Sequence, residues 1–149
     1  MNVIRVTKSF SFEMAHALWN YDGPCRHIHG HSYKLWVTVK GEPDNLTKEA
    51  KRGMVIDFGD LKRIVQRNIV VRFDHALVIS SENREVVLRG ADQLFGKLEV
   101  MDFQPTSENM IAYFASILKE KLPEKISLVK LRLRETESSY AEWYAEDNP

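Results

Sequence analysis

Two segments of the chain alternate apolar and polar residues, which is typical of strands with one buried face. The first, residues 3–16, places four side chains on its apolar face: Phe10, Phe12, Met14 and His16. In the second, residues 31–41, the face that bears His29 and His31 continues through Tyr33, Leu35, Val37 and Val39. The pattern predicts two strands whose histidines converge at one end of an apolar face if the strands pair.

Two stretches have the spacing of amphipathic helices. Asp57 has the position of an N-cap, and apolar residues follow it at helical spacing up to about Val70. Thr106 or Ser107 caps a second predicted helix, which ends near Leu122. The core-facing stripe of that helix consists of Met110, Ile111, Phe114, Ile117 and Leu118.

Two further strands are predicted at residues 126–135 and 139–146. One face of the first holds Val129, Leu131, Leu133 and Glu135. Residues 80–102 have the least regular pattern, with a short helix expected in 82–95 and a short strand in 97–103. The order of elements predicts an α+β fold, an antiparallel sheet with helices packed on one side.

Composition restricts the class of protein. The 149 residues contain 21 basic and 21 acidic side chains, so the net charge is zero, which argues against nucleic acid or an anionic membrane as the main partner. One cysteine excludes an internal disulfide, and no apolar run approaches the ~20 residues of a membrane span. Because the start lacks a signal peptide, we expect a soluble, cytoplasmic protein.

Four of the five histidines and the only cysteine lie between positions 16 and 31. Three convergent imidazoles, from His16, His29 and His31, suit a Zn²⁺ ion with an open fourth position. Two alternatives stay open: histidines that are hydrogen-bonded without a metal, and a closed structural zinc site with Cys25 as the fourth ligand. Beside a cation, the Cys25 thiolate is a usable base or nucleophile; otherwise it is an inert buried thiol.

Three other positions are candidates for chemistry. In Asp74-His75 the carboxylate can orient the imidazole, but adjacent strand residues point to opposite faces, so a structural role is the alternative. Glu135, on the apolar side of a strand, either reaches solvent or accepts hydrogen bonds from a ligand such as the N–H edge of a pterin. Thr106 and Ser107 are primarily caps, with ligand contact as a second possibility.

Taken together, these motifs resemble the 6-pyruvoyltetrahydropterin synthase / 6-carboxytetrahydropterin synthase family. The motifs are His16, Cys25-x-x-x-His29-Gly30-His31, Asp74-His75, Pro105-Thr106-Ser107-Glu108-Asn109 and Glu135-Thr136. The likeness covers Phe10 to about Tyr144, so residues 1–149 are expected to form a single pterin synthase-like domain.

The resemblance implies a T-fold: a four-stranded antiparallel sheet with two helices, three subunits closing a β-barrel, and two trimers stacking as a homohexamer. It also implies Zn²⁺ on His16, His29 and His31, and a substrate of the 7,8-dihydroneopterin triphosphate class. Cys25 would abstract a proton, and Asp74 and His75 would complete its relay. Glu135 would bind the pterin ring with help from the turn at Thr106 and Ser107.

The three residues between Cys25 and His29 resemble the spacing in bacterial 6-carboxytetrahydropterin synthases of the queuosine pathway. His27 and residues 80–102 depart from that shorter pattern. The alternatives are a 6-pyruvoyltetrahydropterin synthase of the biopterin pathway, a zinc hydrolase, and a non-catalytic zinc- or pterin-binding module. No His-Glu-x-x-His sequence supports the hydrolase.

Overall fold

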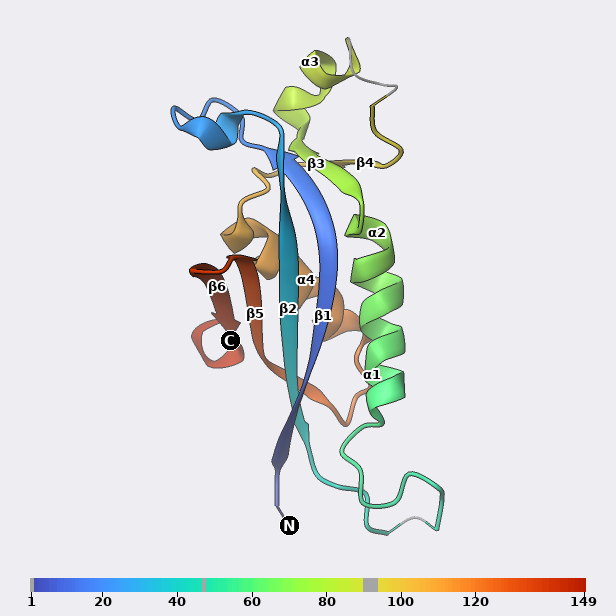
Figure 1. The fold of residues 1–149 in the computed structure, drawn as a ribbon. Coiled ribbons are helices and arrows are strands. Elements are labelled where there is room, and N and C mark those ends of the chain that lie inside the picture. The colour runs from blue at the N-terminus through green and yellow to red at the C-terminus, as the bar shows by residue number, and fades with distance from the viewer. Residues whose placement is uncertain (1, 47, 90–93) are drawn as a thin grey trace.

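The computed structural model describes residues 2–46, 48–89 and 94–149, which form a six-stranded sheet in the order β4-β3-β1-β2-β5-β6 (Figure 1). The strands are β1 (Ile4–Ala17), β2 (His29–Gly41), β3 (Ala76–Ser80), β4 (Leu98–Met101), β5 (Ser127–Thr136) and β6 (Ser139–Tyr144). The four strands predicted from alternation are β1, β2, β5 and β6, and they pair antiparallel. β3 and β4 extend them as parallel neighbours, so the sheet is mixed and wider than predicted.

The first predicted helix is a continuous helical run of three parts: α1 (Phe58–Val65), a π-helical segment (Gln66–Val70) and α2 (Val71–Phe73). Asp57 caps it as expected, because its carboxylate accepts from the backbone N–H groups of Gly59 and Asp60. In α4 (Ser107–Lys121) the cap is Thr106, whose side chain accepts from Asn109 N–H. The short α3 (Arg84–Leu88) lies within the predicted 82–95 helix, of which residues 90–93 fall outside the described residues.

Both long helical segments cover the same face of the sheet, and one apolar core lies between the layers (Figure 1). The core joins strand residues such as Phe12 and Leu35 to Leu61 of α1 and Phe114 of α4. The α+β class is therefore confirmed. None of the described helices is long and apolar enough to cross a membrane.

Irregular pairing of β5 changes which of its side chains face the core. The register with β2 shifts between Thr38 and Val39, so that Val39 pairs with Leu128 and Val129 is the extra residue. Leu128 is consequently buried while Val129 is only half-buried, so the prediction that Val129 shares the core face was wrong. A second register shift, against β6, leaves Glu135 as the extra residue between Arg134 and Thr136. Such bulges re-aim side chains at the end of a strand.

Glu142 on β6 holds the free edge of the sheet through charged contacts with β5. Its carboxylate accepts from Lys130 Nζ and Arg132 Nε, both at 2.8 Å, and from Tyr144 Oη at 2.5 Å. These donors lower the pKa of Glu142 to about 2, and the hydrogen bond from Lys130 is the largest cause.

We expect Glu142→Gln to reduce the free energy of unfolding by about 1 kcal/mol at pH 7, a modest value because solvent screens the network. A carboxylate with a depressed pKa stabilises the fold above its unfolded pKa of ~4.5, and this contribution disappears as the pH falls through about 2. Urea unfolding at several pH values should show the two proteins converging below pH ~4. A pH-independent difference would contradict the electrostatic origin, and Glu137→Gln, at a 92% exposed carboxylate on the same hairpin, is the control.

Candidate metal centre and active site

The pairing of β1 with β2 brings three histidines to one end of the core face. His16 lies opposite His29, and His31 lies opposite Met14. The ring centroids are 4.6 Å apart for His16 and His29, 5.3 Å for His16 and His31, and 4.9 Å for His29 and His31. One nitrogen from each ring lies within 4.8 Å of the other two, so the three side chains can hold a metal ion together.

Hydrogen bonds at the far side of two rings define their tautomers. His16 Nδ1 lies 2.7 Å from the Pro105 carbonyl oxygen, and His29 Nδ1 lies 2.7 Å from the His27 carbonyl oxygen. Since a carbonyl only accepts, both Nδ1 atoms carry the proton, and each Nε2 of a neutral ring presents a lone pair.

The resulting donor set fits a metal ion. The Nε2 atoms of His16 and His29 face each other at 3.0 Å, where two lone pairs repel unless a cation lies beside them. His31 Nε2 is buried, and no hydrogen bond satisfies it within the described ranges; Glu135 Oε1 lies 3.2 Å away without hydrogen-bond geometry. Carbonyl groups behind metal-binding imidazoles are the usual way in which a protein orients such ligands.

Burial keeps these imidazoles in the form that binds metals. His16 is 2% exposed, and desolvation is the main cause that lowers its pKa, with the neighbouring His29 and His31 acting in the same direction. Burial likewise lowers the pKa of His31, against the opposing charge of Glu135. Both rings are therefore neutral at pH 7 and need not lose a proton to bind a cation.

Glu135 lies next to the histidines because the bulge in β5 turns it toward them. Its Oε1 is the atom near His31, and its Oε2 accepts a hydrogen bond from Ser107 Oγ at the start of α4. Of the two possibilities left open by the sequence, the structure places Glu135 at the site, half-buried and partnered. Ser107 shares this contact, whereas the Thr106 hydroxyl is used as the helix cap.

Tyr33 lies beneath the histidines and was not singled out by its sequence context. It is 1% exposed, stacks on Phe12 at 5.5 Å, and meets His31 edge-on at 5.6 Å. Its hydroxyl has no hydrogen-bond partner among the residues that the structure describes. Burial raises the pKa of Tyr33, so the hydroxyl stays protonated and can donate.

Cys25 lies in a short 3₁₀ turn (Pro24–Arg26) above the end of β1 and is half-buried. Its carbonyl oxygen accepts from Leu18 N–H at 3.0 Å, which holds the turn against the strand. Cys25 is not a member of the cluster of potential metal ligands. This arrangement favours a site with an open position over one closed by the thiolate.

Asp74 and His75 form a contact pair, for a reason that the sequence pattern did not indicate. His75 is not on a strand: its φ of 61° is left-handed, and β3 begins one residue later. In this turn His75 Nδ1 lies 3.1 Å from Asp74 Oδ2, while Asp74 Oδ1 accepts from Glu13 N–H at 2.9 Å. That backbone hydrogen bond is the main cause that lowers the pKa of Asp74, so the carboxylate is ionised beside the imidazole.

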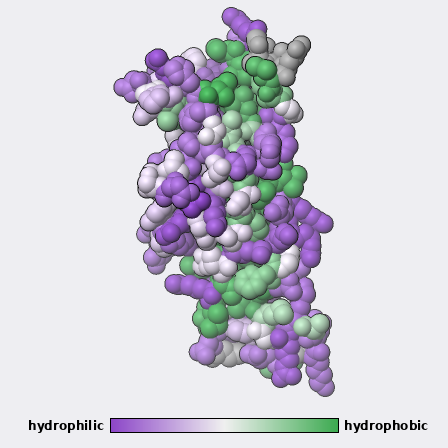
Figure 2. Space-filling model, in the orientation of Figure 1, coloured by the Kyte–Doolittle hydropathy of each residue, from purple (hydrophilic) through white to green (hydrophobic). Residues whose placement is uncertain are grey.

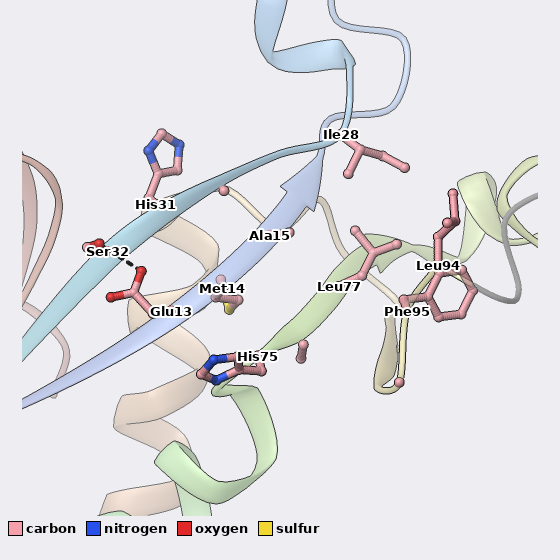
Figure 3. A pocket seen from close by; sticks show the side chains of 13 residues that line it. Glu13, Met14, Ala15, Ile28, His31, Ser32, His75, Leu77, Leu94 and Phe95 are labelled. Atoms are coloured by element: carbon pink, nitrogen blue, oxygen red, sulfur yellow. Dashed lines mark hydrogen bonds between the residues drawn. The ribbon is translucent and has the colours of Figure 1, made fainter.

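The described structure does not bring this pair to Cys25 within one chain. His75 N–H donates to the Glu13 carbonyl, whereas Cys25 is tied to Leu18, five residues further along the chain. Five extended residues span roughly 16 Å. His75 also lines a cavity with Glu13 and Ser32, whose side chains alternate with the histidine positions and so face the other side of the sheet (Figure 3).

That cavity has a volume of about 680 Å³ and a mainly apolar lining. Ile28 and Leu77 form part of its wall, and Leu94 and Phe95 close one side (Figure 3). Ser32 Oγ donates to Glu13 Oε2 at 2.7 Å on the polar side, near His75. Apolar residues also form a band along the length of the molecule in Figure 2, between hydrophilic edges. This face therefore offers both an apolar surface and a carboxylate–imidazole pair.

Gln104 is a further contributor that sequence reasoning missed. Its side-chain amide forms two hydrogen bonds with the Trp19 backbone, accepting from N–H at 2.8 Å and donating to the carbonyl at 2.7 Å. This fixes the segment that carries the Pro105 carbonyl next to His16. Only its place before the Pro105-Thr106 motif could have drawn attention to it.

Comparison with known proteins agrees with this architecture. A crystal structure of an uncharacterized protein from Wolinella succinogenes matches with a TM-score of 0.76 and 22% identity, covering 97% of this chain and 99% of that one. The 6-pyruvoyl tetrahydropterin synthase of Caenorhabditis elegans matches with a TM-score of 0.68 and 24% identity, covering 97% and 96%. These likenesses establish the T-fold.

Sequence comparison identifies the family. The profile of the 6-pyruvoyl tetrahydropterin synthase family matches residues 5–146, so the chain belongs to that family. It is 36% identical over 143 residues to the 6-carboxy-5,6,7,8-tetrahydropterin synthase of Haemophilus influenzae, covering 95% of this chain and 99% of the relative. The resemblance inferred from the motifs is therefore confirmed.

Proposed function

We propose that this protein is a zinc-dependent 6-carboxytetrahydropterin synthase. The reaction converts 7,8-dihydroneopterin triphosphate and water to 6-carboxy-5,6,7,8-tetrahydropterin, triphosphate and acetaldehyde. The main support is the cluster of three imidazoles beside Glu135, in a chain 36% identical to a relative with that name. In the queuosine (7-deazaguanine) pathway this product would be a precursor of the deazaguanine ring.

His16, His29 and His31 would hold the zinc ion, since three nitrogen ligands leave a position open for substrate. When bound, zinc supplies Lewis acidity that makes the protons of a coordinated hydroxyl-bearing side chain easier to remove. The carbonyls of Pro105 and His27 hold two of the rings in the ligating tautomer.

Glu135 would bind the pterin ring. An ionised carboxylate accepts hydrogen bonds from the amino and ring N–H groups along one pterin edge, and such charge-assisted bonds are strong in a half-buried site. Ser107 holds the carboxylate in place, with the Thr106 cap fixing the first turn of α4. A ring bound to Glu135 would lie next to the three histidines, because Glu135 Oε1 is 3.2 Å from His31 Nε2.

Cys25 would remove a proton from a side-chain carbon as the thiolate, and His75, oriented by Asp74, would return a proton or balance the charge. Because Cys25 and His75 are separated in one chain, His75 would serve the site of a neighbouring copy. The apolar cavity beside His75 is a surface for such a neighbour to cover. The cavity supports contact with another copy of the chain, and the homohexamer, a dimer of trimers, is proposed because the resemblance implied it.

The proposal is tested by incubating zinc-loaded protein with 7,8-dihydroneopterin triphosphate and analysing pterins and acetaldehyde by mass spectrometry. We expect 6-carboxytetrahydropterin and acetaldehyde in equal amounts. 6-Pyruvoyltetrahydropterin without acetaldehyde would contradict the assigned product and assign the chain to the biopterin branch. Unchanged substrate, with zinc confirmed in the protein, would contradict an enzymatic role and favour a zinc- or pterin-binding module.

A further inference from the structure

We propose that Lys97 is a positioning residue that holds the Asp74–His75 pair in its working geometry, an inference that rests on the proposed role of His75. Lys97 Nζ donates to the carbonyl oxygens of Val71 and Asp74, each at 2.7 Å. A single ammonium group thus connects the first residue of α2 to the turn that precedes β3. The known motifs of the chain do not include this residue.

The turn needs such a contact because its conformation is unfavourable by itself. His75 has a φ of 61°, a region that residues with a Cβ seldom adopt, and such strain persists only where the surroundings hold it. Two backbone groups already hold one side: Asp74 N–H donates to Val70 O at 2.8 Å, and His75 N–H donates to Glu13 O at 2.6 Å. Lys97 holds the other side by donating to the carbonyl of Val71, in the last turn of the helical run, where carbonyl groups need donors from outside the helix.

The position of Lys97 is itself defined by the sheet. Its carbonyl oxygen accepts from Leu77 N–H at 3.0 Å, and β4 begins at the next residue, with Leu98 opposite Leu77. The parallel strands β3 and β4 therefore bring the ammonium group to the turn. Its positive charge also contributes to the lowered pKa of Asp74, which favours the ionised carboxylate beside His75.

Because the side chain of Lys97 is exposed, its effect on the turn can be separated from its effect on global stability. Hydrogen bonds at an exposed site contribute little to global stability, so removing this one should loosen the turn without unfolding the protein. Lys97→Met keeps the length and the apolar part of the side chain and deletes the donors. Lys97→Arg restores donors that can reach both carbonyls.

In the zinc-loaded Lys97→Met protein we expect the His75 amide, which is bonded to Glu13, to exchange with solvent about tenfold faster. We also expect kcat to fall about tenfold with KM unchanged, because the substrate-binding groups are on the other face. The Tm should move by no more than about 3 °C. Lys97→Arg should restore both the exchange rate and kcat.

Lys51→Met is the matched control, since Lys51 is also an exposed lysine, paired with Asp60 of α1 and distant in sequence from the turn. It should leave His75 exchange and kcat unchanged. Unaltered His75 exchange in Lys97→Met, or faster exchange with normal kcat, would overturn the inference. If the wild-type protein turns over no pterin, the proposed function fails, while the exchange measurement still reports whether Lys97 holds the turn.

Discussion

Replacing His31 by alanine is expected to remove bound zinc and to lower pterin turnover by about 10³-fold or more. Among the described residues, the buried Nε2 of this ring has no hydrogen-bond partner, and it lies within ligand distance of the two other imidazoles, so its loss leaves two nitrogen ligands. Two ligands do not retain zinc against a chelator, and Lewis-acid stabilisation is worth several kcal/mol, which corresponds to this loss of rate. Metal analysis after dialysis and single-turnover rates would measure both effects.

His27→Ala is the matched control, because His27 lies in the same segment but outside the cluster of three. The hydrogen bond of His27 to His29 uses its backbone carbonyl group, which the substitution keeps. It should retain zinc and most of the activity. A His31→Ala protein that turns over substrate normally without zinc would refute the metal assignment, and equal zinc loss in His27→Ala would refute the choice of ligands.

Replacing Cys25 by alanine is expected to abolish turnover while zinc and pterin still bind. Cys25 is outside the histidine cluster, and its contact with Leu18 uses only its backbone carbonyl. The substitution should therefore remove the thiol and leave the turn in place. Losing a general base costs about 10²- to 10⁴-fold in rate, without affecting the affinity of ground-state contacts.

Three measurements on Cys25→Ala distinguish loss of the base from loss of binding. They are the zinc content, the dissociation constant of the unreacted substrate and the single-turnover rate. Cys25→Ser tests the chemistry further, because a hydroxyl has nearly the shape of the thiol but a far higher pKa, so it should be almost as inactive as alanine. Full activity in Cys25→Ala would remove the thiol from the reaction. Loss of zinc in the same variant would instead indicate that sulfur is a ligand.

Some features were decided by short-range patterns and could be predicted from the sequence. The period of two along a strand dictates that His29 and His31 leave the same face and that His16 ends the apolar face of its own strand. If that face is buried, β1 and β2 must pair so that their histidines lie at the same end of the sheet, as observed. Capping by Asp57 and Thr106 was predictable for the same reason, since each cap depends on residues two or three positions away.

Other features depend on contacts between distant segments, which a one-dimensional pattern does not contain. Glu135 reaches the three histidines because a register shift between β5 and β6 leaves it without a partner residue in the strand pairing. Val129 is likewise the extra residue where the pairing of β5 with β2 shifts. The parallel strands β3 and β4 were too short for their pairing to be inferred, and β3 is buried throughout, so it has no alternating pattern.

Periodicity and local spacing in the sequence determined the α+β class and the convergence of the three imidazoles, and the combined motifs carried the resemblance to the family that the comparisons confirm. Only the tertiary structure decided that Asp74 and His75 form a pair in a left-handed turn, that His75 lines a cavity with Glu13 and Ser32, and that Lys97 reaches the turn. The physical reason is that backbone pairing between remote strands sets these positions, and its register is fixed by packing of the whole sheet.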